Sequence, residues 1–158
     1  TYVESGVCDM GVVGKDTIME KGGTFYEVAD LGFGKCRFAL AVVKGKNLYE
    51  GYHNLTIASK YVNVAKNFFE QKSMDVDIVK IEGSVELAPV LGLADAIVDI
   101  VETGTTLKEN GLVVAEDVCP VSARLIVNIA SMKLRKKEIE CLIDKMENDV
   151  QKRREKEA

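Results

Sequence analysis

The chain has 158 residues and a mass of 17.3 kDa, enough for one ordinary domain or two small lobes with a buried core. Apolar residues make up 47% and charged residues 29%, a globular balance that excludes a disordered chain. The net charge of −4 argues against nucleic acid or an anionic membrane as a partner. No apolar stretch approaches the roughly 20 residues that a membrane-spanning helix needs.

In chain order, short apolar runs alternate with amphipathic ones, which is typical of an α/β fold with largely parallel strands. The first half predicts a strand at 7–13, a helix at 16–21, a strand at 36–43, a polar loop at 44–54, a helix at 62–71 and a strand at 76–81. A helix over 84–91 follows, with Ser84 as its expected N-cap.

The second half begins with a strand at 96–101, whose nearly continuous apolar run predicts burial on both faces. A loop over 102–105 leads into a helix at 106–110, which Gly111 should end. Further strands are predicted at 113–115 and 125–127, and one long helix from 133 to about 156. Its apolar stripe consists of Ile139, Leu142, Ile143, Met146 and Val150.

Histidine and cysteine content narrows the possible chemistry. His53 is the only histidine and lies in a polar stretch, so we interpret it as a solvent-facing loop residue. A catalytic triad, a two-histidine metal site and a His-Cys zinc site all lack partners. The four cysteines are widely scattered and three lie in apolar runs, which predicts reduced, buried thiols in a cytoplasmic protein. They are Cys8, Cys36, Cys119 and Cys141.

Two polar crossings, near 53–54 and 120–122, indicate two α/β lobes joined by two hinge strands. Lobe I is expected to comprise residues 1–54 and 122–158, and lobe II residues 55–121. A cleft between two lobes is a common place for a ligand.

The segment after the 96–101 strand has the composition of an anion-binding turn. Gly104 permits close approach of the backbone to a ligand, and Thr103, Thr105 and Thr106 add hydroxyl groups. Free backbone N–H groups and the dipole of the following helix favour a terminal phosphate there. Asp99, at the end of the strand, is placed to accept hydrogen bonds from sugar hydroxyls. The alternative is an ordinary strand-turn-helix with threonine caps, which is common in α/β proteins.

Five segments in fixed order between about Tyr2 and Asn128 carry a family resemblance. They are Asp9-Met10-Gly11-Val12-Val13-Gly14-Lys15-Asp16, Leu31-Gly32-Phe33-Gly34-Lys35-Cys36-Arg37, Ile57-Ala58-Ser59-Lys60-Tyr61, Gly83-Ser84-Val85-Glu86-Leu87-Ala88-Pro89 and Asp99-Ile100-Val101-Glu102-Thr103-Gly104-Thr105-Thr106-Leu107. Together they resemble ATP phosphoribosyltransferase, the enzyme of the first step of histidine biosynthesis. The last segment is similar to that family's phosphoribosyl-pyrophosphate loop.

The resemblance implies a bilobed fold like the type II periplasmic binding proteins. It also implies a glycosyltransferase that moves phosphoribosyl from phosphoribosyl pyrophosphate to N1 of ATP, with Mg²⁺. Carried onto this chain, phosphoribosyl pyrophosphate would contact Asp95, Asp99, Glu102, Thr103, Gly104, Thr105, Thr106 and Leu107. Glu86 would face the cleft and assist magnesium or pyrophosphate as a possible catalytic group. The nucleotide would lie near Asp9, Gly11, Gly14 and Asp16.

The chain departs from the family pattern at its start. The family places a strand and a Lys-Gly-Arg segment before the sequence that opens here at Tyr2, so we expect lobe I to be incomplete and residues 1–158 to be poorly active alone. We also expect no regulatory domain of the kind that long members of the family carry after the last helix. The resemblance is therefore to the short form, which implies a homodimer and assembly with a regulatory subunit similar to histidyl-tRNA synthetase.

Two other functions remain open at this point. A non-enzymatic bilobed protein that binds a small anion or solute would share the fold class, but it would not need an anion turn beside a ribose-binding acid. A nucleobase phosphoribosyltransferase also pairs acids with a Thr-Gly-x-Thr loop, although the other four segments argue against it.

Overall fold

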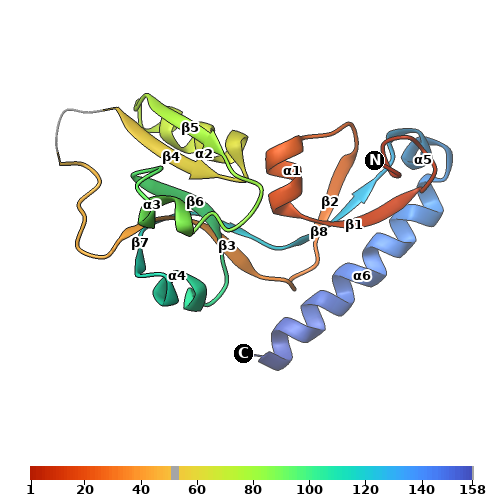
Figure 1. Cartoon of the computed structure of the whole chain (residues 1–158). Helices are drawn as coiled ribbons and strands as arrows, with labels where there is room; N and C mark the ends of the chain where they lie inside the picture. Colours follow the sequence, from red (N-terminus) through yellow and green to blue (C-terminus); the bar gives the residue numbers. More distant parts are fainter. Residues whose placement is uncertain (51–53, 158) are drawn as a thin grey trace. The chain divides into compact units, whose positions relative to one another are not determined.

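The computed structural model describes residues 1–50 and 54–157, which form two compact units (Figure 1). Unit 1 comprises residues 1–35 and 121–158, and unit 2 comprises residues 36–120. The chain therefore passes from one unit to the other twice. His53 lies outside the described residues, so its interpretation as a loop histidine stays a prediction.

The first boundary between the units differs from the predicted one. It falls between Lys35 and Cys36 rather than after Asn54, because strand β3 (Cys36–Val43) belongs to the sheet of unit 2. There it pairs with β6 (Ala96–Val101) from Arg37 opposite Val101 to Val42 opposite Ala96. Such long-range pairing leaves no mark in the local pattern of residues 36–54. The second boundary, at Pro120–Val121, lies within a residue of the predicted one.

The described residues of unit 2 form a five-stranded sheet in the order β5-β4-β6-β3-β7. The strands besides β3 and β6 are β4 (Leu55–Ser59), β5 (Val76–Lys80) and β7 (Leu112–Val121), and the helices are α2 (Val62–Gln71), α3 (Leu87–Val90) and α4 (Thr105–Glu109). Strand β4 runs parallel to both β5 and β6, whereas β3 runs antiparallel to β6. The sheet is thus mixed, and the prediction of largely parallel strands is wrong.

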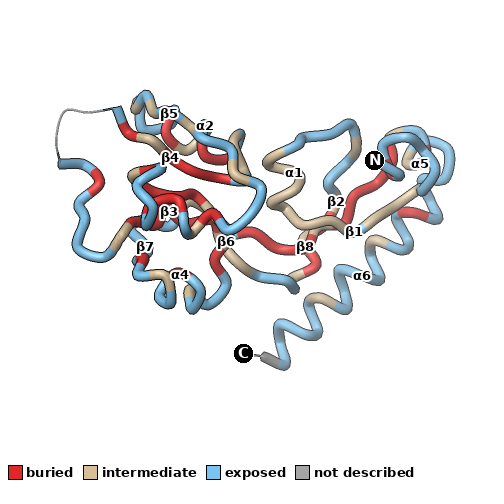
Figure 2. Tube along the Cα trace, in the orientation of Figure 1, coloured by how far each residue is buried: buried red, intermediate tan, exposed pale blue. Residues whose placement is uncertain are grey.

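Burial in unit 2 is nearly continuous along β3, β4 and β6, so side chains on both faces of these strands are covered (Figure 2). On one face, Ala39, Ala41, Ala58, Ile97 and Val101 pack with side chains from α3, α4 and β7, including Ala88, Leu107 and Leu112. Helix α2 packs against β4 and β5, and the fully buried Phe38 meets Tyr61 edge to face, with ring centroids 4.8 Å apart. Because both faces are covered, β6 is rigid up to the point where the cavity begins.

The described residues of unit 1 form a three-stranded sheet in the order β1-β8-β2, with β8 antiparallel to both neighbours. Its elements are β1 (Met10–Gly14), α1 (Lys15–Lys21), β2 (Tyr26–Asp30), β8 (Ala123–Val127), α5 (Ile129–Leu134) and α6 (Lys136–Glu157). Ile143 of α6 packs beside a small core of Ala29, Leu31, Ala123 and Leu125. The Asn128 side chain caps α5 by accepting hydrogen bonds from the N–H groups of Ala130 and Ser131.

Two predicted helices have different limits in the structure. Helix α3 begins at Leu87 rather than at Ser84, because Pro89 lacks an N–H and is tolerated only in a first turn. Ser84 is therefore not the N-cap. The predicted helix over 133–156 is two helices, since the chain breaks at Arg135 (φ −123°) between α5 and α6.

The four cysteines are thiols rather than disulfides, as predicted, but they are less buried than predicted. Cys36 and Cys119 are half-buried, while Cys8 and Cys141 are exposed. Cys8 lies in the turns before β1, and Cys141 lies on the outer face of α6, where Leu142 and Met146 of the apolar stripe are exposed as well. None of the helices in the described part of the chain is both long and apolar enough to span a membrane.

Candidate functional site

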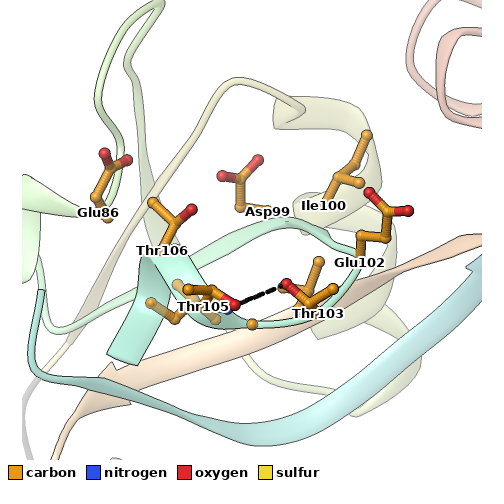
Figure 3. A pocket seen from close by; sticks show the side chains of 10 residues that line it. Glu86, Asp99, Ile100, Glu102, Thr103, Thr105 and Thr106 are labelled. Carbon is orange, nitrogen blue, oxygen red and sulfur yellow. Dashed lines mark hydrogen bonds between the residues drawn. The ribbon is translucent and has the colours of Figure 1, made fainter. Parts of the chain in front are cut away.

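A cavity of about 340 Å³ lies in unit 2 at the carboxyl end of β6 (Figure 3). Its lining comes from the end of β6, the turn that follows, the start of α4 and the segment before α3. The lining residues are Glu86, Asp99, Ile100, Val101, Glu102, Thr103, Gly104, Thr105, Thr106 and Leu107. The carboxyl ends of strands in open α/β sheets are the usual place for a ligand, so the position agrees with the fold.

The turn after β6 is built from glycine and threonine for a geometric reason. Gly104, the N-cap residue of α4, has φ +77°, a left-handed conformation that disfavours any residue with a Cβ. The hydroxyls of Thr103 and Thr105 are 3.0 Å apart, and the Thr105 N–H points to Thr103 Oγ1 at 3.4 Å. Figure 3 shows these two side chains together at the base of the turn.

Helix α4 contributes less to this turn than its sequence suggests. It has five residues, and Asn110 closes it through a hydrogen bond from its side chain to the Thr106 carbonyl (2.9 Å). A helix of little more than one turn has a small macrodipole. An anion at this turn would therefore be held by the hydroxyls and by backbone N–H groups that the short helix leaves free.

Three carboxylates surround the turn, and the described part of the chain provides no ion pair to any of them. They belong to Glu86, Asp99 and Glu102. Burial raises the pKa of Asp99, and the nearby charge of Glu86 raises it further, while the Ile100 N–H and the Lys60 ammonium lower it. A half-buried acid with an unfavourable environment at a cavity is a common feature of functional sites. No lysine or arginine is among the described residues that line the cavity.

The donor set suits magnesium that is shared with a ligand. Among the described residues, no three His, Cys, Asp or Glu side chains gather closely enough to enclose a metal ion. Mg²⁺ is often held by one or two carboxylates, with substrate phosphates and water completing its shell. Glu86 and Asp99 supply that number of carboxylates, and a cation near both would relieve the repulsion from Glu86, which adds to burial in raising the pKa of Asp99.

The structure brings most of the predicted phosphoribosyl residues to this cavity, but not Asp95. Asp95 precedes β6, at the other end of the strand from the turn. Its carboxylate accepts hydrogen bonds from Lys46 Nζ (2.7 Å) and from the Thr56 N–H (3.0 Å). These contacts join the start of β6 to β4 and to the 44–50 loop. Asp95 therefore stabilises the start of the strand and does not line the cavity.

The residues predicted near the nucleotide lie in unit 1 and form no shared polar site. Asp9 pairs with Arg135 at 2.6 Å, and Asp16 lies in the first turn of α1. Gly11 lines a separate, mostly apolar groove, and Gly14 precedes α1, where a Cβ would collide with the Asp16 carboxylate. Both glycines thus have local steric roles, and their contact with a nucleotide stays a prediction.

Sequence reasoning missed the neighbour of Asp99 across the sheet. Lys60 follows β4, and its charge acts on the Asp99 carboxylate. The proximity of Lys60 to Asp99 follows from the parallel pairing of β4 with β6, and it cannot be inferred until the register of the two strands is known.

Comparisons with known proteins agree with this geometry. A family model described as HisG, ATP phosphoribosyltransferase, matches residues 1–148. ATP phosphoribosyltransferase from Clostridium kluyveri is 61% identical over 155 residues, which cover 96% of this chain and 71% of that protein. The protein of the same name from Clostridium acetobutylicum is 59% identical over 152 residues, which again cover 96% and 71%.

Two solved structures resemble the chain. One is the ATP phosphoribosyl transferase (HisG:HisZ) complex from Thermotoga maritima, with a TM-score of 0.82 and 34% identity over 95% of this chain and 74% of that one. The other is the periplasmic aliphatic sulphonate binding protein SsuA from Escherichia coli, with a TM-score of 0.62 and 12% identity over 98% of this chain and 60% of that one. The second likeness concerns the fold alone, and it confirms the predicted bilobed, periplasmic-binding-protein-like architecture. The match over residues 1–148 and the identity of about three residues in five confirm the resemblance found in the sequence: the chain belongs to the HisG family of ATP phosphoribosyltransferases.

Proposed function

We propose that the cavity at the end of β6 binds phosphoribosyl pyrophosphate for transfer of its phosphoribosyl group to N1 of ATP. Membership of the HisG family makes the chain a transferase of the glycosyltransferase class, acting in the first step of histidine biosynthesis. The observation that supports the site best is the threonine and glycine turn directly after Asp99, in one cavity with Glu86.

Each part of the cavity has a chemical role in this proposal. The hydroxyls of Thr103, Thr105 and Thr106 and the adjacent N–H groups hold the 5′-phosphate. The Asp99 carboxylate accepts hydrogen bonds from the ribose diol, and such contacts offset the cost of its burial. Glu102 and Leu107 complete the walls. The sugar is thereby held with its anomeric carbon open to attack.

The reaction needs positioning and charge neutralisation more than a strong base. The N1 lone pair of ATP forms a bond to the anomeric carbon as the bond to pyrophosphate breaks, and holding both reactants in line supplies much of the acceleration. When bound through Glu86 and Asp99, Mg²⁺ would neutralise negative charge on the leaving pyrophosphate. A chain with one histidine can therefore perform this chemistry.

Assembly and location extend the same proposal. The Thermotoga maritima relative is a HisG:HisZ complex, which supports a hetero-oligomer of this chain with a regulatory subunit of the HisZ kind. We also expect a homodimer, and a cytoplasmic location, where ATP and phosphoribosyl pyrophosphate are available. Gel filtration with and without a HisZ-type subunit tests both assemblies.

The test of the function is release of pyrophosphate from phosphoribosyl pyrophosphate in the presence of Mg²⁺. We expect release when ATP is the acceptor, and faster release when a HisZ-type subunit is added. Free purines or pyrimidines in place of ATP should give none. Release with a free base alone would indicate a nucleobase phosphoribosyltransferase, and binding of the sugar phosphate without any release would favour a solute-binding protein.

A further inference from the structure

The cavity at the end of β6 is acidic, although its proposed ligand is strongly anionic. Three carboxylates line it, and the described lining residues include no lysine or arginine. Hydroxyls and backbone N–H groups at the turn serve one phosphate. One divalent ion does not balance the charge of the pyrophosphate at the other end of the sugar, so a cationic side chain there would stabilise it further.

Lys60 is not among the residues that line the cavity, but it directly follows β4, which pairs in parallel with β6, the strand that carries Asp99. In the parallel pair of β4 and β6, Ala58 lies opposite Ile97. Continued by two residues, the same register sets Lys60 opposite Asp99, and residues two apart point to the same face of a sheet. That face carries Ala58, Ile97 and Val101, and it is the face covered by α3 and α4, on which Asp99 meets the cavity.

The backbone on both sides of Lys60 is held firmly. Ser59 is fully buried; its hydroxyl donates to the Val98 carbonyl (2.6 Å) and accepts a hydrogen bond from the Tyr61 N–H (2.9 Å). The Ser59 carbonyl accepts a hydrogen bond from the Ile81 N–H (3.1 Å). The Tyr61 ring packs on Phe38. The Lys60 side chain therefore extends from a fixed point while remaining exposed.

Five basic residues of unit 2 form ion pairs, whereas Lys44, Lys60 and Lys108 form none with a described residue; of these three, Lys60 is the one whose charge acts on Asp99. Ion pairs engage Lys46 with Asp95, Lys66 with Glu70, Lys72 with Glu116, Lys80 with Glu82 and Arg37 with Asp117. Lys60 makes no ion pair within 4 Å with any described residue, although its charge reaches the Asp99 carboxylate and lowers its pKa. Lys60 thus lies near enough to Asp99 to lower its pKa but forms no ion pair with it.

We propose that the Lys60 ammonium binds the pyrophosphate group of phosphoribosyl pyrophosphate. Asp99 has the threonine turn as its neighbour along the chain and Lys60 as its neighbour across the sheet. This order matches the order of groups along the ligand, in which the diol lies between the 5′-phosphate and the anomeric pyrophosphate. Lys60 is a binding residue that helps pyrophosphate to leave, and this role rests on the proposed function of the cavity.

The experiment measures binding of three ligands by calorimetry with Mg²⁺ present: phosphoribosyl pyrophosphate, inorganic pyrophosphate and ribose 5-phosphate. Lys60→Gln should weaken the binding of phosphoribosyl pyrophosphate about tenfold, or ~1.4 kcal/mol, and should also weaken the binding of pyrophosphate. Ribose 5-phosphate should bind within about twofold of wild type, because it lacks the group that Lys60 contacts. Lys60→Arg should retain most of the affinity.

Lys66→Gln is the matched control, because Lys66 is an exposed lysine of the same unit that pairs with Glu70 on α2. It should bind all three ligands as wild type does. Equal affinity of Lys60→Gln and wild type for phosphoribosyl pyrophosphate would overturn the assignment, and so would an equal loss for all three ligands. Failure of the wild-type chain to bind phosphoribosyl pyrophosphate would instead refute the function proposed for the cavity.

Discussion

The two units contain cavities of similar size, but they use their polar side chains differently. The unit 1 groove, about 300 Å³, is lined mostly by apolar residues such as Val3, Met10 and Phe25. Several carboxylates elsewhere in that unit form ion pairs, as Asp9 does with Arg135 and Glu27 with Lys15. In unit 2, by contrast, the cavity itself is lined by carboxylates that form no ion pair with a described residue.

Two aspartates show what this difference means. Burial acts to raise the pKa of Asp30 in unit 1, but hydrogen bonds from the Gly32 N–H and the Ser122 hydroxyl and the charge of Arg124 outweigh it, so the pKa is lowered. For Asp99 in unit 2, burial prevails and Glu86 adds to it, so the pKa is raised. The ionised Asp30 carboxylate therefore stabilises unit 1, whereas the ionised Asp99 carboxylate lowers the stability of unit 2, a cost that a bound ligand can offset.

The largest expected effect is a loss of stability when the core beneath the sheet of unit 2 is disrupted. Phe38 is fully buried and lies opposite Ile100 in the β3–β6 pair. Phe38→Ala should lower the free energy of unfolding by about 3–5 kcal/mol, because it leaves a void beneath β6. Denaturation in urea measures it. Phe33, 52% exposed in unit 1, is the control, and Phe33→Ala should change stability by less than about 0.5 kcal/mol. Similar losses for both variants would contradict the difference in packing.

The second prediction concerns the polar network that stabilises unit 1. Asn128 caps α5 and also donates a hydrogen bond from Nδ2 to the Val3 carbonyl at 2.7 Å. Asn128→Ala should cost roughly 2–4 kcal/mol, because a cap is lost and buried polar groups lose their partner. Asn128→Asp keeps the acceptor oxygen but not the donor, so its loss should be intermediate. A loss for Asn128→Asp as large as that for alanine would show that the cap contributes nothing.

How far the sequence predicts this molecule depends on the range of the interactions. The turn at Thr103–Thr106 is predictable because its hydroxyls and Gly104 act within a few residues. The first boundary between the units is not, because β3 joins unit 2 only through its pairing with β6. Lys60 is missed for the same reason, since its proximity to Asp99 depends on strand register. The sequence predicts that Asp95 binds the ligand. In the structure its carboxylate instead accepts a hydrogen bond from Lys46, which is 49 residues away in the chain.

The third prediction sharpens the assignment of the turn in unit 2. Thr105→Val keeps the shape of the side chain but removes the hydroxyl that lies 3.0 Å from Thr103 Oγ1. Binding of phosphoribosyl pyrophosphate should weaken about tenfold, or ~1.4 kcal/mol, and more than binding of ATP. Calorimetry with each ligand measures the difference. Thr105→Ser restores a hydroxyl and should bind nearly as wild type does, whereas an equal loss for both ligands would argue against this location of the 5′-phosphate.

The smallest effect is a gain in stability at Asp99. Because its pKa is raised in the folded state, the folded chain holds its proton more tightly than the unfolded chain does. Stability of the ligand-free protein should therefore fall as the pH rises from the ordinary aspartate pKa, 3.8, through the raised value. Asp99→Asn removes the cost of burying an ionised carboxylate and should stabilise the protein at pH 7 by about 0.5–1 kcal/mol. The same change should weaken the binding of phosphoribosyl pyrophosphate. Thermal unfolding at several pH values measures the gain.

The sign of this effect separates the two units most directly. The advantage of Asp99→Asn should disappear below pH 3.8, where the carboxyl of the wild-type chain is protonated in both states. Asp30→Asn in unit 1 is the matched comparison and should behave in the opposite way. The lowered pKa of Asp30 contributes stability above 3.8 that is lost as the pH falls through the lowered value, so the variant should be less stable at pH 7. If both variants lost stability at pH 7, the Asp99 carboxylate would have to be a structural group like Asp30, and the acid in the unit 2 cavity would no longer point to a ligand.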